Sequence, residues 1–136
     1  MRWVDTNVFI RLLTQDDPAK AEASGRFFTS LDAGQDEAAT SEMVVGEVVY
    51  VLSARGHYGM SREGIRDRLA RMLESQGLRI AGKEVLLRAL DFYVAYPRLD
   101  FEDALSVAHM EARGISDIVS YDRGFDAVDG VTRIEP

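Results

Sequence analysis

Short apolar runs alternate along the chain with longer segments in which apolar residues recur at helical spacing. Five runs are short and apolar enough to form strands, at 1–4, 38–41, 78–81, 118–121 and 131–134. The longer segments predict helices at 6–13, 18–31, 42–55, 85–96 and 101–113, and one more that begins after Ser61. Strands that alternate with helices indicate an α/β domain with a parallel sheet, in which ligands bind at the carboxyl ends of the strands.

The length and composition suit one globular domain. The chain has 136 residues, of which 46% are hydrophobic and 29% charged, so we expect a single domain spanning 1–136. It contains no cysteine, which excludes a disulfide framework and a thiolate metal site and makes the cytoplasm the expected compartment. No segment resembles a signal peptide or reaches the length of a membrane span, so we expect no membrane association.

The charge balance is acidic. Asp and Glu outnumber Lys and Arg by 23 to 16, which gives a formal net charge of −7. This counts against simple electrostatic capture of nucleic acid, so a metal ion or a partner would have to supply positive charge. The alternative is that the excess acid is ordinary solvated surface. The arginines at 62, 66, 68 and 71 form either a basic patch or one face of a solvated helix.

Two aspartates follow predicted strands directly. Asp5 comes after the strand at 1–4, and Asp122 comes after the strand at 118–121. In α/β domains this position is where chemistry is placed. The competing interpretation is that each aspartate caps a helix, since its side chain can accept hydrogen bonds from free backbone N–H groups.

Two further acids lie on predicted helices. Glu47 borders the apolar arc of the helix at 42–55, so its carboxylate should point toward the edge of the core. Asp103 shares a helical line with Val107 and Met110 and should also face inward. The alternative for Asp103 is structural, because Asp100 and Asp103 together resemble a helix cap followed by an acidic first turn.

A cluster of these carboxylates would need a cation. Several like charges at one end of a sheet cost several kcal/mol unless something neutralises them, as an order of magnitude. Ligation by oxygen alone, without His or Cys, suits Mg²⁺ or Mn²⁺ better than zinc.

Four segments resemble the motifs of PIN domains of the VapC toxin type. They are Val4–Leu13, with an Asp-Thr-Asn after the first strand; Ser41–Leu52, with an acid before an apolar-aromatic run; Asp100–Ala108, with an acid before Ala-Leu; and Ile118–Phe125, with a hydroxyl residue two positions before an acid. The segments occur in the family's order and cover essentially the whole chain. Ser120 stands where threonine is usual, which keeps the hydroxyl.

The resemblance implies a fold and an activity. The fold would be a three-layer α/β/α domain around a central parallel sheet of about five strands. The activity would be that of a metal-dependent endoribonuclease, the toxin of a type II toxin–antitoxin system. It would use Mg²⁺ or Mn²⁺, form a homodimer, and be silenced by a small cognate antitoxin protein.

The resemblance also implies residue roles. The catalytic metal ligands would be Asp5, Glu47, Asp103 and Asp122, with Asp100 as a secondary candidate. Asn7 and Ser120 would orient these ligands, and Arg11 and Arg123 lie where they could contact RNA. For both arginines, surface solvation or a carboxylate partner is the alternative. Asp126 is either a fifth acid at the rim or a turn residue.

Two other functions compete with the nuclease. A PIN-like binding module could keep the fold and use it without catalysis. A Mg²⁺-dependent phosphoacceptor domain would need an acidic pair after the first strand and a lysine late in the chain, but the only lysines are Lys20 and Lys83. Acetyl phosphate labelling would separate this second alternative from the nuclease.

Overall fold

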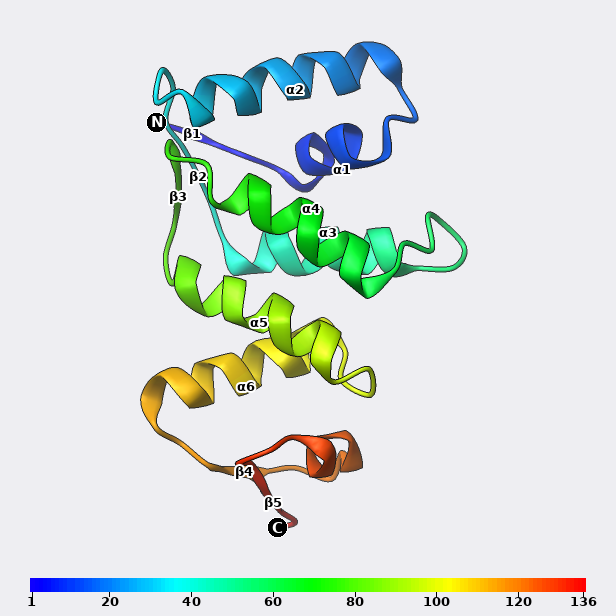
Figure 1. Cartoon of the computed structure of the whole chain (residues 1–136), viewed down its shortest axis with the longest axis vertical. Helices are drawn as coiled ribbons and strands as arrows, with labels where there is room; N and C mark the ends of the chain where they lie inside the picture. The colour runs from blue at the N-terminus through cyan, green and yellow to red at the C-terminus, as the bar shows by residue number, and fades with distance from the viewer. The chain divides into compact units, whose positions relative to one another are not determined.

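The computed structural model describes all 136 residues as two compact units, Met1–Lys83 and Glu84–Pro136 (Figure 1). The first unit contains β1 (Arg2–Trp3), α1 (Thr6–Thr14), α2 (Pro18–Asp32), β2 (Ala38–Thr40), α3 (Glu42–Ser53), α4 (Arg62–Leu73) and β3 (Leu78–Ile80). Its three strands form a parallel sheet in the order β1-β2-β3. The carboxyl ends of the three strands therefore meet at one edge.

The second unit is smaller and also mixes helices with parallel strands. It contains most of α5 (Lys83–Ala95), then α6 (Phe101–Arg113), β4 (Asp117–Val119), the short 3-10 helix η1 (Arg123–Ala127) and β5 (Thr132–Ile134). Strands β4 and β5 pair in parallel, with Ile118 opposite Arg133. The return from β4 to β5 runs through η1, which packs against β5.

The predicted α/β class and the parallel pairing of the strands are confirmed. All six predicted helices and all five predicted strands are present. The strands form two hydrogen-bonded sheets, one of three strands and one of two, where the sequence predicts one central sheet. The single domain over residues 1–136 stays a prediction.

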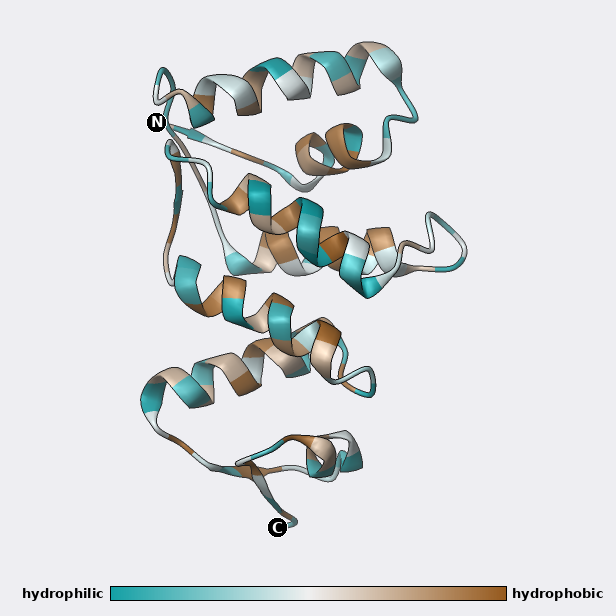
Figure 2. Cartoon of the chain, in the orientation of Figure 1, coloured by the Kyte–Doolittle hydropathy of each residue, from teal (hydrophilic) through white to brown (hydrophobic).

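Helix packing in the first unit follows the apolar arcs in the sequence. Helix α1 packs against both α2 and α3, and α3 packs against α4. The rings of Phe9 and Phe28 lie 5.2 Å apart, which joins α1 to α2. Val45, Val48 and Leu69 are completely buried. Figure 2 shows hydrophobic stripes along helices whose other faces are hydrophilic.

The core of the second unit lies between α5 and α6. Leu86, Leu90 and Ala104 are fully buried, and Tyr93 and Phe101 meet edge to face with ring centroids 6.0 Å apart. On the surface Arg88 donates two hydrogen bonds to the Glu111 carboxylate, which links the same two helices. These contacts fix the start of α6, which holds two of the candidate site residues.

Several element ends differ from the sequence prediction by one or two residues. The helix at 42–55 ends at Ser53, because Ala54 is already extended with φ −64° and ψ 125°. The strand predicted at 118–121 runs from Asp117 to Val119. Ser120 still donates its N–H to Ile134 O in β5 at 3.0 Å, but the chain then turns toward η1, and the Ser120 hydroxyl accepts a hydrogen bond from Asp122 N. Asp122 thus lies three residues beyond the strand.

Gly77 is expected to be irreplaceable for packing reasons. Its N–H donates to Leu31 O at 2.9 Å, and a methyl group on its Cα would overlap the carbonyl oxygen of Asp36. Gly77→Ala should therefore lower the free energy of unfolding by about 2 kcal/mol or more, because backbone must move to make room. Urea denaturation measures the change. Gly56→Ala is the control, since no atom lies within 4 Å of the added methyl; equal stabilities of the two variants would contradict the packing.

No helix combines the length and the apolar character that a membrane span requires.

Candidate active site

The Asp5 carboxylate is free. Asp5 occupies the N-cap position of α1 with extended backbone, φ −87° and ψ 162°, yet its side chain makes no capping hydrogen bond and is exposed. The backbone beneath it is fixed, because Val4 is buried and its N–H donates to Ala39 O at 2.9 Å. Buried Thr40 donates its hydroxyl to Val4 O at 3.0 Å. A firmly held backbone therefore presents an unengaged carboxylate at the carboxyl end of β1.

Glu47 lies on the exposed face of α3. Ser41 caps this helix by accepting a hydrogen bond from Val44 N, and Glu47 follows in the second turn. Met43 and Tyr50, one turn to either side of Glu47, are 79% and 65% exposed. The sequence predicts a carboxylate at the margin of the core, and the structure places it outside that margin, with no hydrogen-bond or ionic partner.

The other two candidates of the first unit differ from each other. Asn7 is exposed in the first turn of α1. Arg11 donates to Asp16 at 3.1 Å, and the same carboxylate accepts a hydrogen bond from Tyr58 OH at 2.6 Å. The Tyr58 hydrogen bond, followed by that of Thr14, lowers the pKa of Asp16 to about 2. Arg11 thus has the carboxylate partner that the sequence leaves open as its alternative.

Three acids of the second unit lie near one another. Asp100 is the N-cap of α6, and its carboxylate accepts a hydrogen bond from Asp103 N at 2.9 Å. Asp122 is the N-cap of η1, and its carboxylate accepts from Gly124 N at 2.8 Å. Both capping interpretations are therefore realised, and both carboxylates keep further lone pairs for other donors or a cation.

The Asp103 carboxylate is the most perturbed of the set. Partial burial, followed by the negative charge of Asp100, a hydrogen bond to Asp100 and the charge of Asp122, together raise its pKa to about 6. A raised pKa in a carboxylic acid means that its ionised form lacks a compensating positive charge. Asp103 thus lies where added positive charge would be most stabilising.

The Asp126 carboxylate is paired with Arg133. Arg133 donates to both of its carboxylate oxygens, at 2.9 and 3.3 Å, and this pairing lowers the pKa of Asp126. The residue lies within η1, as the turn interpretation expects. Arg123, at the start of η1, is exposed and has no hydrogen-bond or ionic partner.

The candidate ligands suit a hard cation, but they are not assembled into a metal-binding site. Every candidate ligand is a carboxylate, which fits Mg²⁺ or Mn²⁺. No group of three or more His, Cys, Asp or Glu side chains is arranged to hold a metal ion. Asp5 and Glu47 belong to the first unit, while Asp103 and Asp122 belong to the second.

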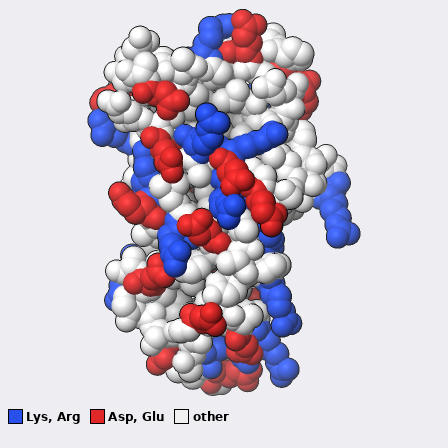
Figure 3. Space-filling view, viewed as in Figure 1, with Lys and Arg blue, Asp and Glu red and all other residues white.

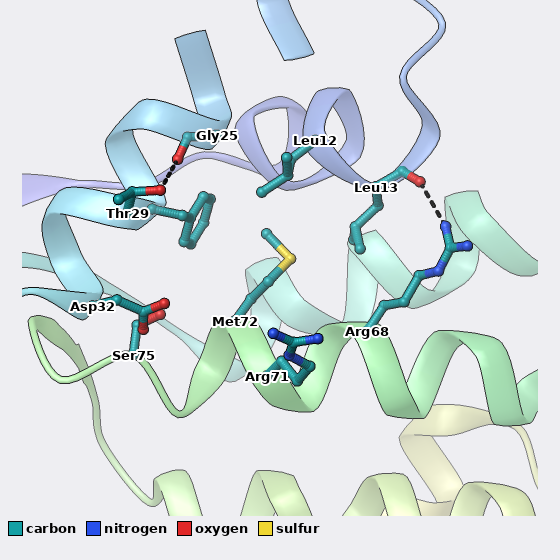
Figure 4. A pocket seen from close by; sticks show the side chains of 10 residues that line it. Leu12, Leu13, Gly25, Thr29, Asp32, Arg68, Arg71, Met72 and Ser75 are labelled. Atoms are coloured by element: carbon teal, nitrogen blue, oxygen red, sulfur yellow. Dashed lines mark hydrogen bonds between the residues drawn. The ribbon is translucent and has the colours of Figure 1, made fainter. Parts of the chain in front are cut away.

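A separate hollow opens between α1, α2 and α4 (Figure 4). Its volume is about 350 Å³, and its walls include Leu12, Phe28 and Met72, with Arg68 and Arg71 along α4. Arg68 donates to Leu13 O at 3.2 Å. None of the four principal carboxylates lines this pocket, so it is a different feature from the candidate site.

Sequence reasoning misses several residues that shape the site. The hydrogen bond from Tyr58 to Asp16 joins positions 42 residues apart, and no local pattern indicates it. The bond from Thr40 to Val4 spans 36 residues. A polar residue at the end of a buried strand is the one signal that could have indicated Thr40, because buried hydroxyls need a partner.

The sequence model of the PIN domain matches residues 3–131. No curated protein shows significant similarity to the chain. Among solved structures, the chain is similar to VapC20 of Mycobacterium tuberculosis, described as a sarcin–ricin loop cleaving toxin, with 23% identity, full coverage of both chains and a TM-score of 0.41. Because the PIN domain model spans nearly all of its 136 residues, the protein belongs to the PIN domain family.

Proposed function

We propose that this PIN domain protein is a metal-dependent endoribonuclease, the toxin component of a type II toxin–antitoxin system. The observation that supports it most is the unengaged Asp5 carboxylate, which occupies a capping position without capping the helix. An aspartate kept free at a strand end serves no evident structural purpose there. Family membership and the VapC-type motifs add the expectation of RNA as substrate.

The proposed metal ligands are Asp5, Glu47, Asp103 and Asp122, with Asp100 as a secondary one. We propose that residues 1–136 act as one domain. When bound, a Mg²⁺ or Mn²⁺ ion would lower the pKa of a coordinated water and offset the charge of the phosphodiester. Hydrolysis would leave a 5′-phosphate and a 3′-hydroxyl.

The remaining site residues would position the ligands. Ser120 accepts a hydrogen bond from Asp122 N at 3.0 Å, which orients the backbone that carries this carboxylate. The Thr40 hydroxyl donates a hydrogen bond to Val4 O, which orients the backbone just before Asp5. We propose that Asn7, in the first turn of α1 after Asp5, orients that carboxylate or its substrate. Arg123 would contact RNA.

The proposed partners are an RNA substrate, a small antitoxin protein and a second copy of the chain. The pocket between α1, α2 and α4 suits one amphipathic helix of the antitoxin, because it offers apolar walls beside Arg68 and Arg71. Acidic residues at the edge of such a helix would meet these arginines. Figure 3 shows that elsewhere on this face the two signs of charge are interspersed.

The phosphoacceptor alternative receives no support. Such a site needs a lysine beside the acceptor, but Lys20 lies in α2 and Lys83 begins α5. The Lys83 amine donates to Leu78 O at 2.6 Å and so holds the end of β3.

Cleavage of an end-labelled pool of cellular RNAs tests the proposal. Purified protein without antitoxin should make discrete cuts with Mg²⁺ or Mn²⁺, each carrying a 5′-phosphate, and none with EDTA. Glu47→Gln should abolish the cuts. Glu63→Gln, an exposed acid in the first turn of α4, is the matched control and should cut normally. If folded protein binds Mn²⁺ tightly but cuts no RNA, the non-catalytic binding module replaces the nuclease.

A further inference from the structure

Two arginines of the second unit are left without partners. Three of its five arginines are engaged: Arg88 with Glu111, Arg113 with His109, and Arg133 with Asp126 and Glu135. Arg98 and Arg123 make no ion pair or hydrogen bond and are exposed. Their guanidinium groups are therefore available to an anionic ligand.

Both arginines lie beside the acidic cluster of Asp100, Asp103 and Asp122. Arg123 follows Asp122 directly, and Arg98 lies two residues before Asp100. Gly124 brings the two segments together, because a methyl group in place of its hydrogen would lie 3.0 Å from Asp122 Oδ1 and 3.3 Å from Arg98 O. The start of η1 and the loop before α6 are therefore packed backbone to backbone.

The loop that holds Arg98 is well anchored. Leu99 is fully buried and its N–H donates to Tyr96 O at 3.0 Å. The Tyr96 hydroxyl in turn accepts a hydrogen bond from Asp129 N at 3.3 Å, just past η1. The backbone of Arg98 is thus fixed relative to Asp122, while its side chain extends into solvent.

A further carboxylate near these arginines, that of Asp126, already has a partner. Asp126 receives two hydrogen bonds from Arg133, whose side chain is only 12% exposed. Arg123 and Arg98 both contribute to lowering the pKa of Asp126, which places their charges in the same neighbourhood. Two exposed guanidinium groups without an ion-pair partner therefore lie next to the candidate metal ligands.

We propose that Arg98 acts together with Arg123 as a clamp for an RNA phosphate next to the one that is cleaved. This rests on the proposed nuclease function and adds Arg98 to its substrate-binding residues. Guanidinium groups bind phosphate oxygens with paired, charge-assisted hydrogen bonds. The clamp also accounts for how a chain with a net charge of −7 holds a polyanion beside its own carboxylates.

The salt dependence of RNA binding tests the clamp. Anisotropy of a fluorescent single-stranded RNA of mixed sequence would be measured with EDTA present, so that no cleavage occurs. Arg98→Ala should weaken binding about tenfold and reduce the slope of log K against log salt by about 0.7. Arg98→Lys should keep the slope, because it keeps the charge. Thermal melting checks that each variant is folded.

Arg113→Ala is the matched control. Arg113 ends α6, at the opposite end from Asp103, roughly 15 Å away along the helix axis. It should change neither the affinity nor the slope. If Arg98→Ala behaves like Arg113→Ala while wild-type protein cuts RNA, the clamp is refuted and the nuclease stands. If wild-type protein neither binds nor cuts RNA, the proposed function itself fails.

Discussion

Asp5→Asn is expected to lower the rate of RNA cleavage by at least about 100-fold while the melting temperature stays within roughly 2 °C. The amide keeps the shape of the side chain but cannot serve as an anionic metal ligand. Stability should be nearly unchanged because the carboxylate of Asp5 makes no hydrogen bond in the folded chain. Single-turnover cleavage of end-labelled RNA and thermal melting measure the two effects.

Asp17 is the matched control for Asp5. It is also the N-cap of a helix, but its side chain does accept a hydrogen bond, from Lys20 N at 3.2 Å. Asp17→Ala should lower the free energy of unfolding by about 1 kcal/mol and leave cleavage unchanged. Asp5→Ala should leave stability nearly unchanged and abolish cleavage. An Asp5→Asn protein that cuts at the wild-type rate would remove Asp5 from the catalytic site.

Asp103→Asn is expected to abolish cleavage and to stabilise the metal-free protein above pH 6. The folded-state pKa of Asp103, about 6, lies above its ordinary value of 3.8 because of partial burial and the neighbouring Asp100 and Asp122 carboxylates. Between these two pH values the folded chain binds more protons than the unfolded chain. Its stability therefore falls as pH rises through this window and stays low above it.

The amide removes this penalty. A shift of that size corresponds to at most about 3 kcal/mol, and solvent screening at this half-exposed position reduces it to about 1 kcal/mol, or roughly 2 to 5 °C in melting temperature. The gain should be full at pH 7 to 8 and vanish near pH 4. Melting curves with EDTA across this range measure it. Glu84→Gln, an exposed acid in the first turn of α5, is the matched control for loss of a carboxylate. A gain that is constant with pH would contradict the charge argument.

The helices were predictable because their signals are local. Asp17 with Pro18, Ser41 and Ser61 each begin a helix where the sequence expects one, through caps that span three residues. Gly114, with φ 68°, ends α6 as predicted. Strand pairing was less accessible, since each strand has only two or three residues and its partner is fixed by contacts far along the chain.

The sequence suggests candidate site residues but does not indicate their surroundings. Sequence motifs identify Asp103 and Asp122, but the raised pKa of Asp103 depends on how α6 and η1 pack. Likewise Arg11 and Arg123 look alike in sequence, yet Arg11 pairs with Asp16 and Arg123 stays unpaired. Which arginine finds a carboxylate is decided by tertiary contacts that periodicity and spacing do not record.

The most direct test of the proposed site is an anomalous diffraction map of the protein crystallised with Mn²⁺. We predict Mn²⁺ coordinated at about 2.1 Å by carboxylate oxygens of the proposed ligands, Asp5 or Asp103 among them. Glu47 and Asp122 should bind Mn²⁺ directly or through water. Mn²⁺ bound away from all four carboxylates would contradict the proposed site.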